Sequence, residues 1–422
     1  MHVALITAGG AGMFCGSCMH DNTLARALIA EGHSVTLIPT YTPIRLDERD
    51  VSTGRVFLGG INVYLDETVP LWRRLPRGLV GWLDSPGLIR LVSRFAISAD
   101  ARKLGKLTVD LLKGIEGPQA REINELATFI GRDLRPDLVC FSNALLAGVL
   151  PSLRQVFSGR VDCLLQGDDI FLDELTEPYR AQALELLRRH ARLFDRFLVH
   201  SGYYRDFMAE YLSLPQSAMH VVPLGIDLAG HDGAPRQAAG DPFTIGYFAR
   251  VCPEKGLHLL LDAFRIVHQK YPRTRLVAGG YLGRRDEAYF AKLAREAAEL
   301  GDAFGYIGSP AGHEEKVAFL KTLDVLSVPT VYREPKGIYV LEALANGVPV
   351  VEPRHGAFPE IIEATGGGML VAPGDSIDLA RGLMELVADG KRRHDLALRG
   401  QAAVREKFDA RTMALATLAV WS

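Results

Sequence analysis

Residues 333–347 read REPKGIYVLEALANG. This stretch places Glu334 and Glu342 eight positions apart, with a small-residue turn between them. From Gly337 onward we expect a helix, and Gly347 is a natural stop for it. Glu342 is then a carboxylate inside an otherwise apolar helix. Because a buried charge without a partner is costly, we expect a polar group to face it. The alternative is a half-exposed helix glutamate.

Short apolar runs alternate with longer amphipathic runs on both sides of this stretch. The first series of expected strands is 2–7, 34–38, 61–65, 137–141, 161–165 and 196–200. The second series is 243–248, 274–278, 303–307, 323–328 and 348–352. The expected helices between them include 21–31, 181–193, 255–269, 287–300 and 313–322. This alternation predicts an α/β protein with two Rossmann-like, doubly wound parallel sheets.

A linker separates the two series. Residues 229–240 read AGHDGAPRQAAG, which is small, polar and glycine-rich. We therefore expect an N-terminal domain over 1–228 and a C-terminal domain over 241–403. Two such domains would face each other across a cleft at the carboxyl ends of their strands, where ligands bind in doubly wound sheets.

Composition narrows the class of protein. A chain of 422 residues is too long for one core and suits two domains. Apolar residues make up 48% and charged residues 23%, and the net charge of −2 gives no field that would attract nucleic acid. The apolar runs are strand-sized, and the first residues predict a strand rather than a signal peptide. Five cysteines fit a reducing cytosol, so we expect a cytoplasmic protein.

A basic segment follows the expected strand 243–248. It reads RVCPEKGL over residues 250–257 and opens a helix, with Pro253 suited to the first turn. Free amides at a helix start attract anions, and Arg250 and Lys255 add two positive charges there. A diphosphate is the natural guest. The alternative is a loop with two solvated basic residues.

The loop after the first strand is rich in glycine, which lets backbone approach a ligand closely. Gly10 and Gly12 begin a G-x-G-x-x-G pattern, but Cys15 occupies its last position. The strand 34–38 is followed by no acid that could bind a ribose hydroxyl, which argues against a nicotinamide cofactor. The chain has no G-K-[ST] sequence, so a P-loop is excluded.

Two further motifs admit a metal or redox interpretation. Cys15 and Cys18 have C-x-x-C spacing with His20 nearby, but a zinc site needs further ligands, so small residues in a tight loop are the favoured interpretation over a redox pair. Asp168 and Asp169 follow the strand 161–165 and could hold a divalent metal. They could also cap the next helix, which we favour.

Residues 71–82 read LWRRLPRGLVGW, and Arg90 and Arg94 extend this mixture of tryptophan and arginine. Basic amphipathic segments can lie on anionic lipid or bind an acidic acceptor. The favoured alternative is a pair of surface helices whose apolar side packs on the sheet. Peripheral contact with the inner membrane face stays an open alternative.

Taken together, these segments resemble the retaining glycosyltransferases of family 4, which have the two-domain GT-B fold. The segment from Arg250 to Gly256 matches the basic diphosphate motif of that family, and the segment from Glu334 to Glu342 matches its E-x7-E motif. Residues 222–227 look like the strand and loop before the linker, and residues 356–362 look like the G-x-x-P-E-I segment. The likeness is dense from about 196 to 375 and weaker before.

The resemblance implies a nucleoside-diphosphate sugar donor bound mainly by the C-terminal domain, with no cofactor. Arg250 and Lys255 would neutralise the diphosphate in place of a metal, Glu342 would accept the ribose hydroxyls, and Glu334 would face the sugar ring. Sugar hydroxyls or phosphate would bind the amides of Gly337, Ile338 and Tyr339. The reaction implied is front-face hexosyl transfer with retention, in which the leaving phosphate takes the proton of the acceptor. Residues 404–422 would pack back on the N-terminal domain.

The chain departs from the family at two places. Gln166 stands where the family often has a histidine, and glutamine cannot titrate. Asp168 and Asp169 are the alternatives for that role. The first loop is longer than usual, so either Gly10 and Gly12, or Gly16, would bring backbone to the phosphate.

Two other functions remain as alternatives. The protein could bind a sugar nucleotide without transferring sugar, or it could be a GT-B epimerase or phosphorylase. The acceptor is a sugar, a lipid or a small molecule, and the base of the donor is uridine, guanosine or adenosine. The sequence makes no prediction about the oligomeric state.

Overall fold

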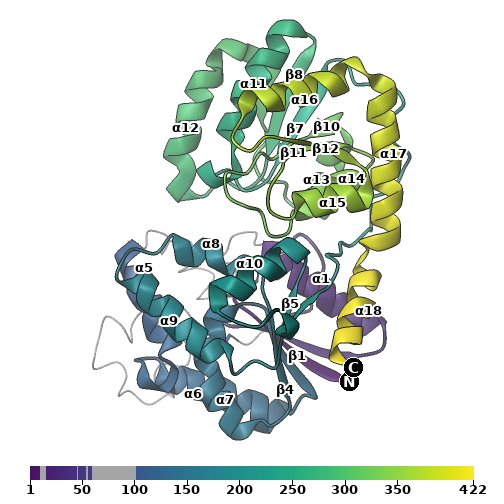
Figure 1. Cartoon of the computed structure of the whole chain (residues 1–422). Coiled ribbons are helices and arrows are strands. Elements are labelled where there is room, and N and C mark those ends of the chain that lie inside the picture. Colours follow the sequence, from purple (N-terminus) through teal and green to yellow (C-terminus); the bar gives the residue numbers. More distant parts are fainter. Residues whose placement is uncertain (10–15, 45, 54–55, 59–100) are drawn as a thin grey trace. The chain divides into compact units, whose positions relative to one another are not determined.

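The computed structural model describes residues 1–9, 16–44, 46–53, 56–58 and 101–422 (Figure 1). The chain divides into two compact units. One consists of Met1–Val222 together with Ala414–Ser422, and the other of Pro223–Met413. Each unit has its own parallel sheet and its own hydrophobic core.

The sheet of the N-terminal unit has, within the described residues, six parallel strands in the order β2-β1-β3-β4-β5-β6. These are β1 (His2–Thr7), β2 (Ser34–Pro39), β3 (Leu138–Phe141), β4 (Arg160–Leu164), β5 (Arg196–Val199) and β6 (Met219–Val221). The run from Val3 to Ile6 is fully buried, as expected for a strand with helices on both faces of its sheet. The strand order reverses between β1 and β3, so this sheet is doubly wound.

The helices of this unit lie between the strands in sequence. They are α1 (Gly16–Ala30), α5 (Ala101–Leu112), α6 (Ala120–Thr128), α7 (Leu150–Val156), α8 (Asp168–Asp173), α9 (Tyr179–Ala191) and α10 (Gly202–Leu212). Shorter turns are the 3-10 segments Gly114–Glu116, Ala144–Val149 and Gln216–Ala218 and the π segment Phe129–Leu134. The last helix, α18 (Ala410–Trp421), ends in this unit, where Arg160 donates a hydrogen bond of 2.6 Å to the carbonyl oxygen of Trp421.

The C-terminal unit repeats the plan. Its described strands form a parallel sheet in the order β12-β11-β10-β7-β8-β9. They are β7 (Phe243–Phe248), β8 (Thr274–Gly279), β9 (Phe304–Tyr306), β10 (Val325–Leu326), β11 (Val350–Pro353) and β12 (Gly368–Val371). The order reverses between β7 and β10, which pair directly with each other. The loops that follow these two strands are therefore neighbours.

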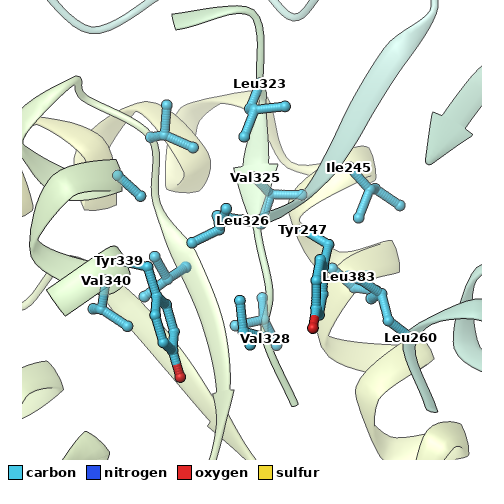
Figure 2. Close-up of a cluster of buried hydrophobic side chains, with 14 of the residues drawn as sticks. Ile245, Tyr247, Leu260, Leu323, Val325, Leu326, Val328, Tyr339, Val340 and Leu383 are labelled. Carbon is cyan, nitrogen blue, oxygen red and sulfur yellow. The ribbon is translucent and has the colours of Figure 1, made fainter. Parts of the chain in front are cut away.

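Helices pack on this sheet and close its core. They are α11 (Leu257–Lys270), α12 (Glu287–Glu296), α13 (His313–Lys321), α14 (Ile338–Ala345), α15 (Phe358–Thr365), α16 (Ser376–Ala388) and α17 (Gly390–Lys407), with 3-10 turns at Pro253–Lys255, Arg284–Asp286 and Ala297–Ala303. Figure 2 shows apolar side chains of β7 and β10 meeting Leu260 of α11, Val340 of α14 and Leu383 of α16. This packing fixes α11 and α14, the two helices that begin beside the candidate site.

The expected α/β class with two doubly wound parallel sheets is confirmed. The edge strands β6 and β12 were not predicted, and the expected strand 61–65 lies outside the described residues.

The division between the units falls after Val222 and again after Met413, whereas the sequence places the boundaries at 228 and 403. Residues 229–240 thus belong to the C-terminal unit. The expected cleft between the domains stays a prediction. None of the described helices could span a membrane.

Asp162 is an unusual residue at the centre of β4. Its side chain is fully buried and forms no ion pair with any residue that the structure describes. Burial raises the pKa of Asp162 from 3.8 to about 7, although the positive charge of Arg160 opposes the shift. The folded protein therefore favours the protonated acid. Since the folded pKa exceeds the unfolded one, the free energy of unfolding falls as pH rises from about 4 to about 7.

Asp162→Asn should remove this loss of stability at high pH. We expect the variant to be more stable than the wild type at pH 8 by an amount on the order of 1 kcal/mol per unit of pKa shift, and the gain should shrink toward pH 5. Urea denaturation at both pH values measures it. Asp133→Asn, at an exposed position of the same unit, is the control. An equal gain at both pH values would contradict the account.

Candidate functional site

The site of the C-terminal unit forms where β7 and β10 end. After β7 comes the basic segment 250–257, and after β10 comes the loop that carries Glu334. The backbone N–H of Val331 donates a 2.9 Å hydrogen bond to the carbonyl oxygen of Glu254 and so joins the two loops. The sheet order thus brings together two motifs that are about eighty positions apart in the chain.

Gly256 lets the two loops touch. It lies at the start of α11 with a φ of 71°, in the left-handed region. A Cβ atom at this position would lie 1.9 Å from the carbonyl oxygen of Pro329. Only glycine fits this backbone conformation and this close approach. The start of α11, and with it Lys255, is therefore held against the loop after β10.

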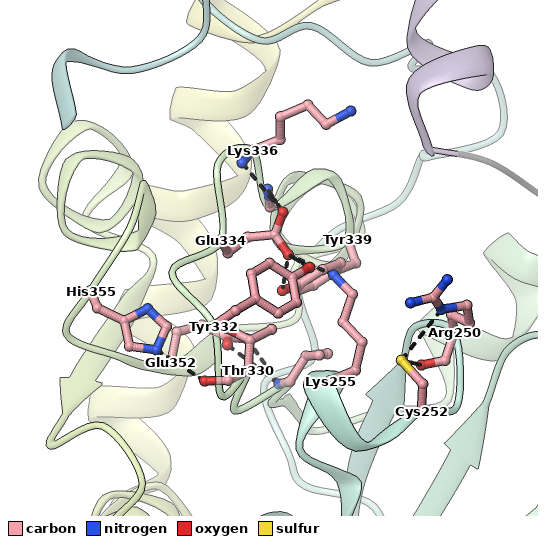
Figure 3. A network of polar contacts seen from close by, with 12 residues as sticks. Arg250, Cys252, Lys255, Thr330, Tyr332, Glu334, Lys336, Tyr339, Glu352 and His355 are labelled. Atoms are coloured by element: carbon pink, nitrogen blue, oxygen red, sulfur yellow. Dashed lines mark hydrogen bonds and ion pairs between the residues drawn. The ribbon is translucent and has the colours of Figure 1, made fainter. Parts of the chain in front are cut away.

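Lys255 and Glu334 form a buried ion pair. The lysine Nζ lies 2.6 Å from Oε2 of Glu334, and the two side chains are 15% and 6% exposed. The hydroxyl groups of Tyr332 and Tyr339 donate to the same oxygen at 2.8 and 3.3 Å. The ammonium also lies 5.1 Å from the centroid of each tyrosine ring, at cation–π distance. Figure 3 shows this group around the glutamate.

The surroundings of Glu334 determine its charge. Burial alone would raise the pKa of this carboxyl, but the charge and hydrogen bond of Lys255 outweigh it and lower the pKa to about 2. The other oxygen, Oε1, accepts hydrogen bonds from the backbone N–H groups of Lys336 and Gly337 at 3.3 and 3.4 Å. Glu334 is therefore ionised at neutral pH and bound to its own loop at the start of α14. The amide of Gly337, expected at the donor, is among its partners.

Arg250 lies to one side of this group and is exposed (Figure 3). Its Nε donates a hydrogen bond of 3.3 Å to the sulfur of Cys252. Among the described residues, no carboxylate forms an ion pair with its guanidinium. The charge of Lys255 is balanced by Glu334, and Glu254 of the same segment forms an ion pair with Arg285 at 3.7 Å, so the guanidinium of Arg250 keeps free donors at the start of α11. An anion can bind there.

Glu342 has the polar neighbour that its sequence position predicts. Its Oε1 lies 2.6 Å from the Nζ of Lys316 on α13, and the two side chains are 7% and 4% exposed. The alternative of a half-exposed helix glutamate is wrong. Gly347 has a φ of 69°, and its backbone N–H bonds to the carbonyl oxygen of Leu344, so it ends α14 as expected.

Sequence reasoning missed several polar residues of this site. Tyr332 and Lys316 were not singled out, and neither was Glu352 in β11. Glu352 is fully buried, and the backbone N–H of Val328 donates to its two oxygens at 3.2 and 3.4 Å. Burial raises the pKa of Glu352 well above its ordinary range, so the fold favours the uncharged form of this carboxyl group. A glutamate within the apolar run VVEP was the signal that could have found it.

The N-terminal unit carries a separate polar cluster at the carboxyl end of its sheet. Asp21 of α1 is fully buried and accepts hydrogen bonds from Thr7 at 2.6 Å and from the side-chain amide of Gln166 at 2.8 Å. The amide of Gln166 is therefore fixed by Asp21. Gly16 is the first residue of α1, whereas Gly10 and Gly12 lie outside the described residues.

The two aspartates after β4 do not cap α8 as expected. Gly167 is the N-cap, and Asp168 lies in the first turn. Its carboxylate accepts hydrogen bonds from the backbone N–H groups of Ala144 at 2.7 Å and Gln166 at 3.0 Å, so it joins the loops after β3 and β4. Burial raises the pKa of Asp168 to about 6. Asp169 accepts a 2.6 Å hydrogen bond from the hydroxyl of Tyr204.

The described part of the chain offers no group of three or more histidine, cysteine or acidic side chains arranged to hold a metal. Cys18 is buried in α1, and Cys15 lies outside the described residues, so the redox interpretation stays untested. Residues 71–82, Arg90 and Arg94 also lie outside them.

Comparison with known proteins agrees with the C-terminal motifs. Residues 233–402 match the family model of glycosyl transferases group 1. The chain is 29% identical over 235 residues to the putative colanic acid biosynthesis glycosyltransferase WcaL of Escherichia coli. This match covers 54% of this chain and 55% of that protein. It is 32% identical over 186 residues to D-inositol 3-phosphate glycosyltransferase of Corynebacterium jeikeium, covering 41% and 44%. The chain thus spans about half the length of the curated relatives that it matches.

Solved structures share the fold over the whole chain. The crystal structure of Anabaena HepE in complex with UDP has a TM-score of 0.69 at 18% identity and covers 100% of this chain and 99% of its own. Sucrose-phosphate synthase from Thermosynechococcus elongatus has a TM-score of 0.68 at 18% identity, with 100% and 98% covered. These matches confirm the GT-B fold, and the sequence matches show that residues 233–402 are similar to glycosyl transferases group 1. Membership of family 4 stays a prediction.

Gly256→Ala tests the contact between the two loops. We expect it to lower the free energy of unfolding by clearly more than the ~1–2 kcal/mol that left-handed backbone costs an alanine, because the new Cβ would push against Pro329. Gly374→Ala is the matched control, since Gly374 also has a φ of 71° and a Cβ added there would meet no atom within 4 Å. Equal losses in the two variants, measured by urea denaturation, would contradict the close contact.

Proposed function

We propose that this protein is a retaining, metal-independent glycosyltransferase that moves a hexosyl group from a nucleoside-diphosphate sugar to an acceptor. The observation that carries the proposal is the exposed guanidinium of Arg250, which has no ion pair with the described residues and lies beside the Lys255–Glu334 pair at the start of α11. A diphosphate needs cations and backbone N–H donors at one point, and this point supplies both. The match of residues 233–402 to glycosyl transferases group 1 supports the proposal.

In this proposal the C-terminal unit binds the donor. Arg250 binds the diphosphate, and Lys255 contributes a second cation because its ammonium has three donors and needs only one for Glu334. The amides of Ile338 and Tyr339, at the start of α14, bind the sugar or phosphate. Helix N-termini have free N–H groups for this purpose. Glu342 accepts the ribose hydroxyls. UDP is the proposed nucleotide, in line with the HepE complex.

The proposed reaction breaks the bond between the anomeric carbon and the phosphate oxygen and forms a bond from the same carbon to the acceptor oxygen on the same face. The leaving phosphate takes the proton of the acceptor. Arg250 and Lys255 stabilise the negative charge that grows on this phosphate. Glu334 stays ionised and acts through its charge and hydrogen bonds, since a pKa of about 2 leaves it no proton to donate at neutral pH.

The N-terminal unit is assigned to the acceptor. Gln166, held by Asp21, would hydrogen-bond a sugar hydroxyl, and Asp168 would support it through the backbone of Gln166. The acceptor is a sugar, a lipid or a small molecule, and the location proposed is the cytoplasm, with membrane contact depending on the acceptor. The whole-protein names of the relatives, such as inositol-phosphate and colanic acid glycosyltransferases, are compatible with these classes.

Arg250→Met is the cleanest test of the donor site, because Arg250 has no ion-pair partner among the described residues whose loss would disturb the fold. We expect about tenfold to hundredfold weaker UDP binding and slower sugar transfer, since a charge-assisted hydrogen bond contributes ~1.5–3 kcal/mol. The melting temperature without nucleotide should stay the same. Calorimetry with UDP and a transfer assay over a panel of nucleotide sugars measure the effect.

Arg295→Met, an exposed arginine of α12 in the same unit, is the control. Unchanged UDP affinity in Arg250→Met would overturn the proposed donor site. If the wild type binds UDP tightly but neither transfers sugar nor slowly hydrolyses the donor, the sugar-nucleotide-binding alternative is favoured instead.

Metal independence is tested separately. We expect transfer to continue at its full rate in EDTA, because Arg250 and Lys255 take the place of a metal at the diphosphate. The transfer assay with and without EDTA measures this. A loss of activity that Mg²⁺ restores would contradict it and would direct attention to Asp168 and Asp169.

A further inference from the structure

Helix α13 places a lysine in the interior of the C-terminal unit. The side chain of Lys316 is 4% exposed. Val317 and Leu320, which are close to it in the sequence of α13, are also buried. Burying an ammonium is costly unless it is paired, and an apolar side chain would satisfy the packing at lower cost. A purely structural helix position would therefore favour leucine. The lysine points to a function.

Its partner is Glu342, and the fold fixes both ends of the pair. The Nζ of Lys316 lies 2.6 Å from Oε1 of Glu342. The backbone carbonyl of Glu342 accepts a 2.9 Å hydrogen bond from the side chain of Asn346, which also lies 2.8 Å from the buried ring of His231. Lys316 thus holds the carboxylate from α13, and Asn346 ties the end of the helix that carries Glu342 to the buried His231.

The pairing leaves Glu342 with acceptor capacity that Glu334 does not have. Both oxygens of Glu334 accept hydrogen bonds, from Lys255, two tyrosines and the backbone. In Glu342, Oε1 faces Lys316, whereas Oε2 accepts no hydrogen bond from the residues that the structure describes. A carboxylate oxygen can accept more than one hydrogen bond. Of these two glutamates, Glu342 is therefore the one with an oxygen that can accept hydrogen bonds from hydroxyl groups.

We propose that Lys316 is a positioning residue that holds the carboxyl group of Glu342 in place, so that Oε2 accepts hydrogen bonds from the ribose hydroxyls and the site selects ribonucleotides over 2′-deoxyribonucleotides. The inference rests on the proposed function, which supplies the nucleotide. When a hydroxyl is missing, a carboxylate fixed by Lys316 cannot turn away and loses a donor that it needs on leaving water. Without Lys316, the carboxyl group can change its orientation, and the selectivity falls.

Calorimetric titration of the full chain with UDP and 2′-deoxy-UDP tests this. We expect the wild type to bind UDP about tenfold or more tightly than 2′-deoxy-UDP, the usual scale for one lost hydrogen bond to a charged group. In Lys316→Met the UDP affinity should fall and the ratio should shrink to about twofold. Lys316→Arg should keep most of the ratio. Lys292→Met, at an exposed ion-paired lysine of α12, should change neither value.

If Lys316 had a merely structural role, Lys316→Met would lower the melting temperature and leave the ratio of the two affinities unchanged. The double variant Lys316→Met with Glu342→Gln removes both buried charges, so it should recover the melting temperature of the wild type while its ratio stays low. If Lys316→Met alone does not fold, Lys316→Gln, which removes the charge and keeps a hydrogen-bond donor, gives the ratio instead, and it should also fall. A tenfold ratio that persists without Lys316 would overturn this inference and leave the proposed function intact. A wild type that binds neither UDP nor GDP would overturn the proposed function together with it.

Discussion

The cost of removing carboxylates from water governs the C-terminal unit, and three buried glutamates meet it in different ways. Glu334 keeps its charge because Lys255 and two tyrosine hydroxyls surround it. Glu342 is paired with Lys316 from another helix. Glu352, which has one backbone N–H for its two oxygens, gives up its charge instead. Each solution depends on a different packed neighbour, so the charge state of every glutamate follows from the tertiary structure.

These pairs exist because of the order of the strands. β7 and β10 lie next to each other at the point where the sheet reverses its order, so the segment after one strand meets the loop after the other. Gly256 permits the contact, since any side chain there would collide with Pro329. The same contact sets where Lys255 can reach. The ion pair therefore depends on the doubly wound topology and on the left-handed backbone of Gly256. A change in either would move Lys255 away from Glu334.

Much of this arrangement could be predicted from sequence. The alternation of strand and helix patterns determined the α/β class, and the cost of burial required a polar neighbour for Glu342. The identity of that neighbour could not be predicted, because Lys316 lies 26 positions away on another helix and no periodic pattern marks it. Strands β6 and β12, of three and four residues, were missed, and each has only one buried residue, so neither shows the continuous apolar run of a central strand. The cap assigned to Asp168 was wrong because the backbone of Ala144, from a neighbouring loop, takes its carboxylate.

The electrostatics also restrict the chemistry that each unit can perform. Glu334, the carboxylate expected nearest the sugar, has a pKa of about 2 and two engaged oxygens, so it is a poor candidate for moving protons at neutral pH. Arg250 and Lys255 cannot act as bases while charged, and both favour an anion. What the C-terminal unit can offer a reaction is therefore stabilisation of growing negative charge. A leaving group that is itself basic enough to take the proton, such as a phosphate, fits this restriction, whereas a mechanism that uses Glu334, Arg250 or Lys255 as its general base does not.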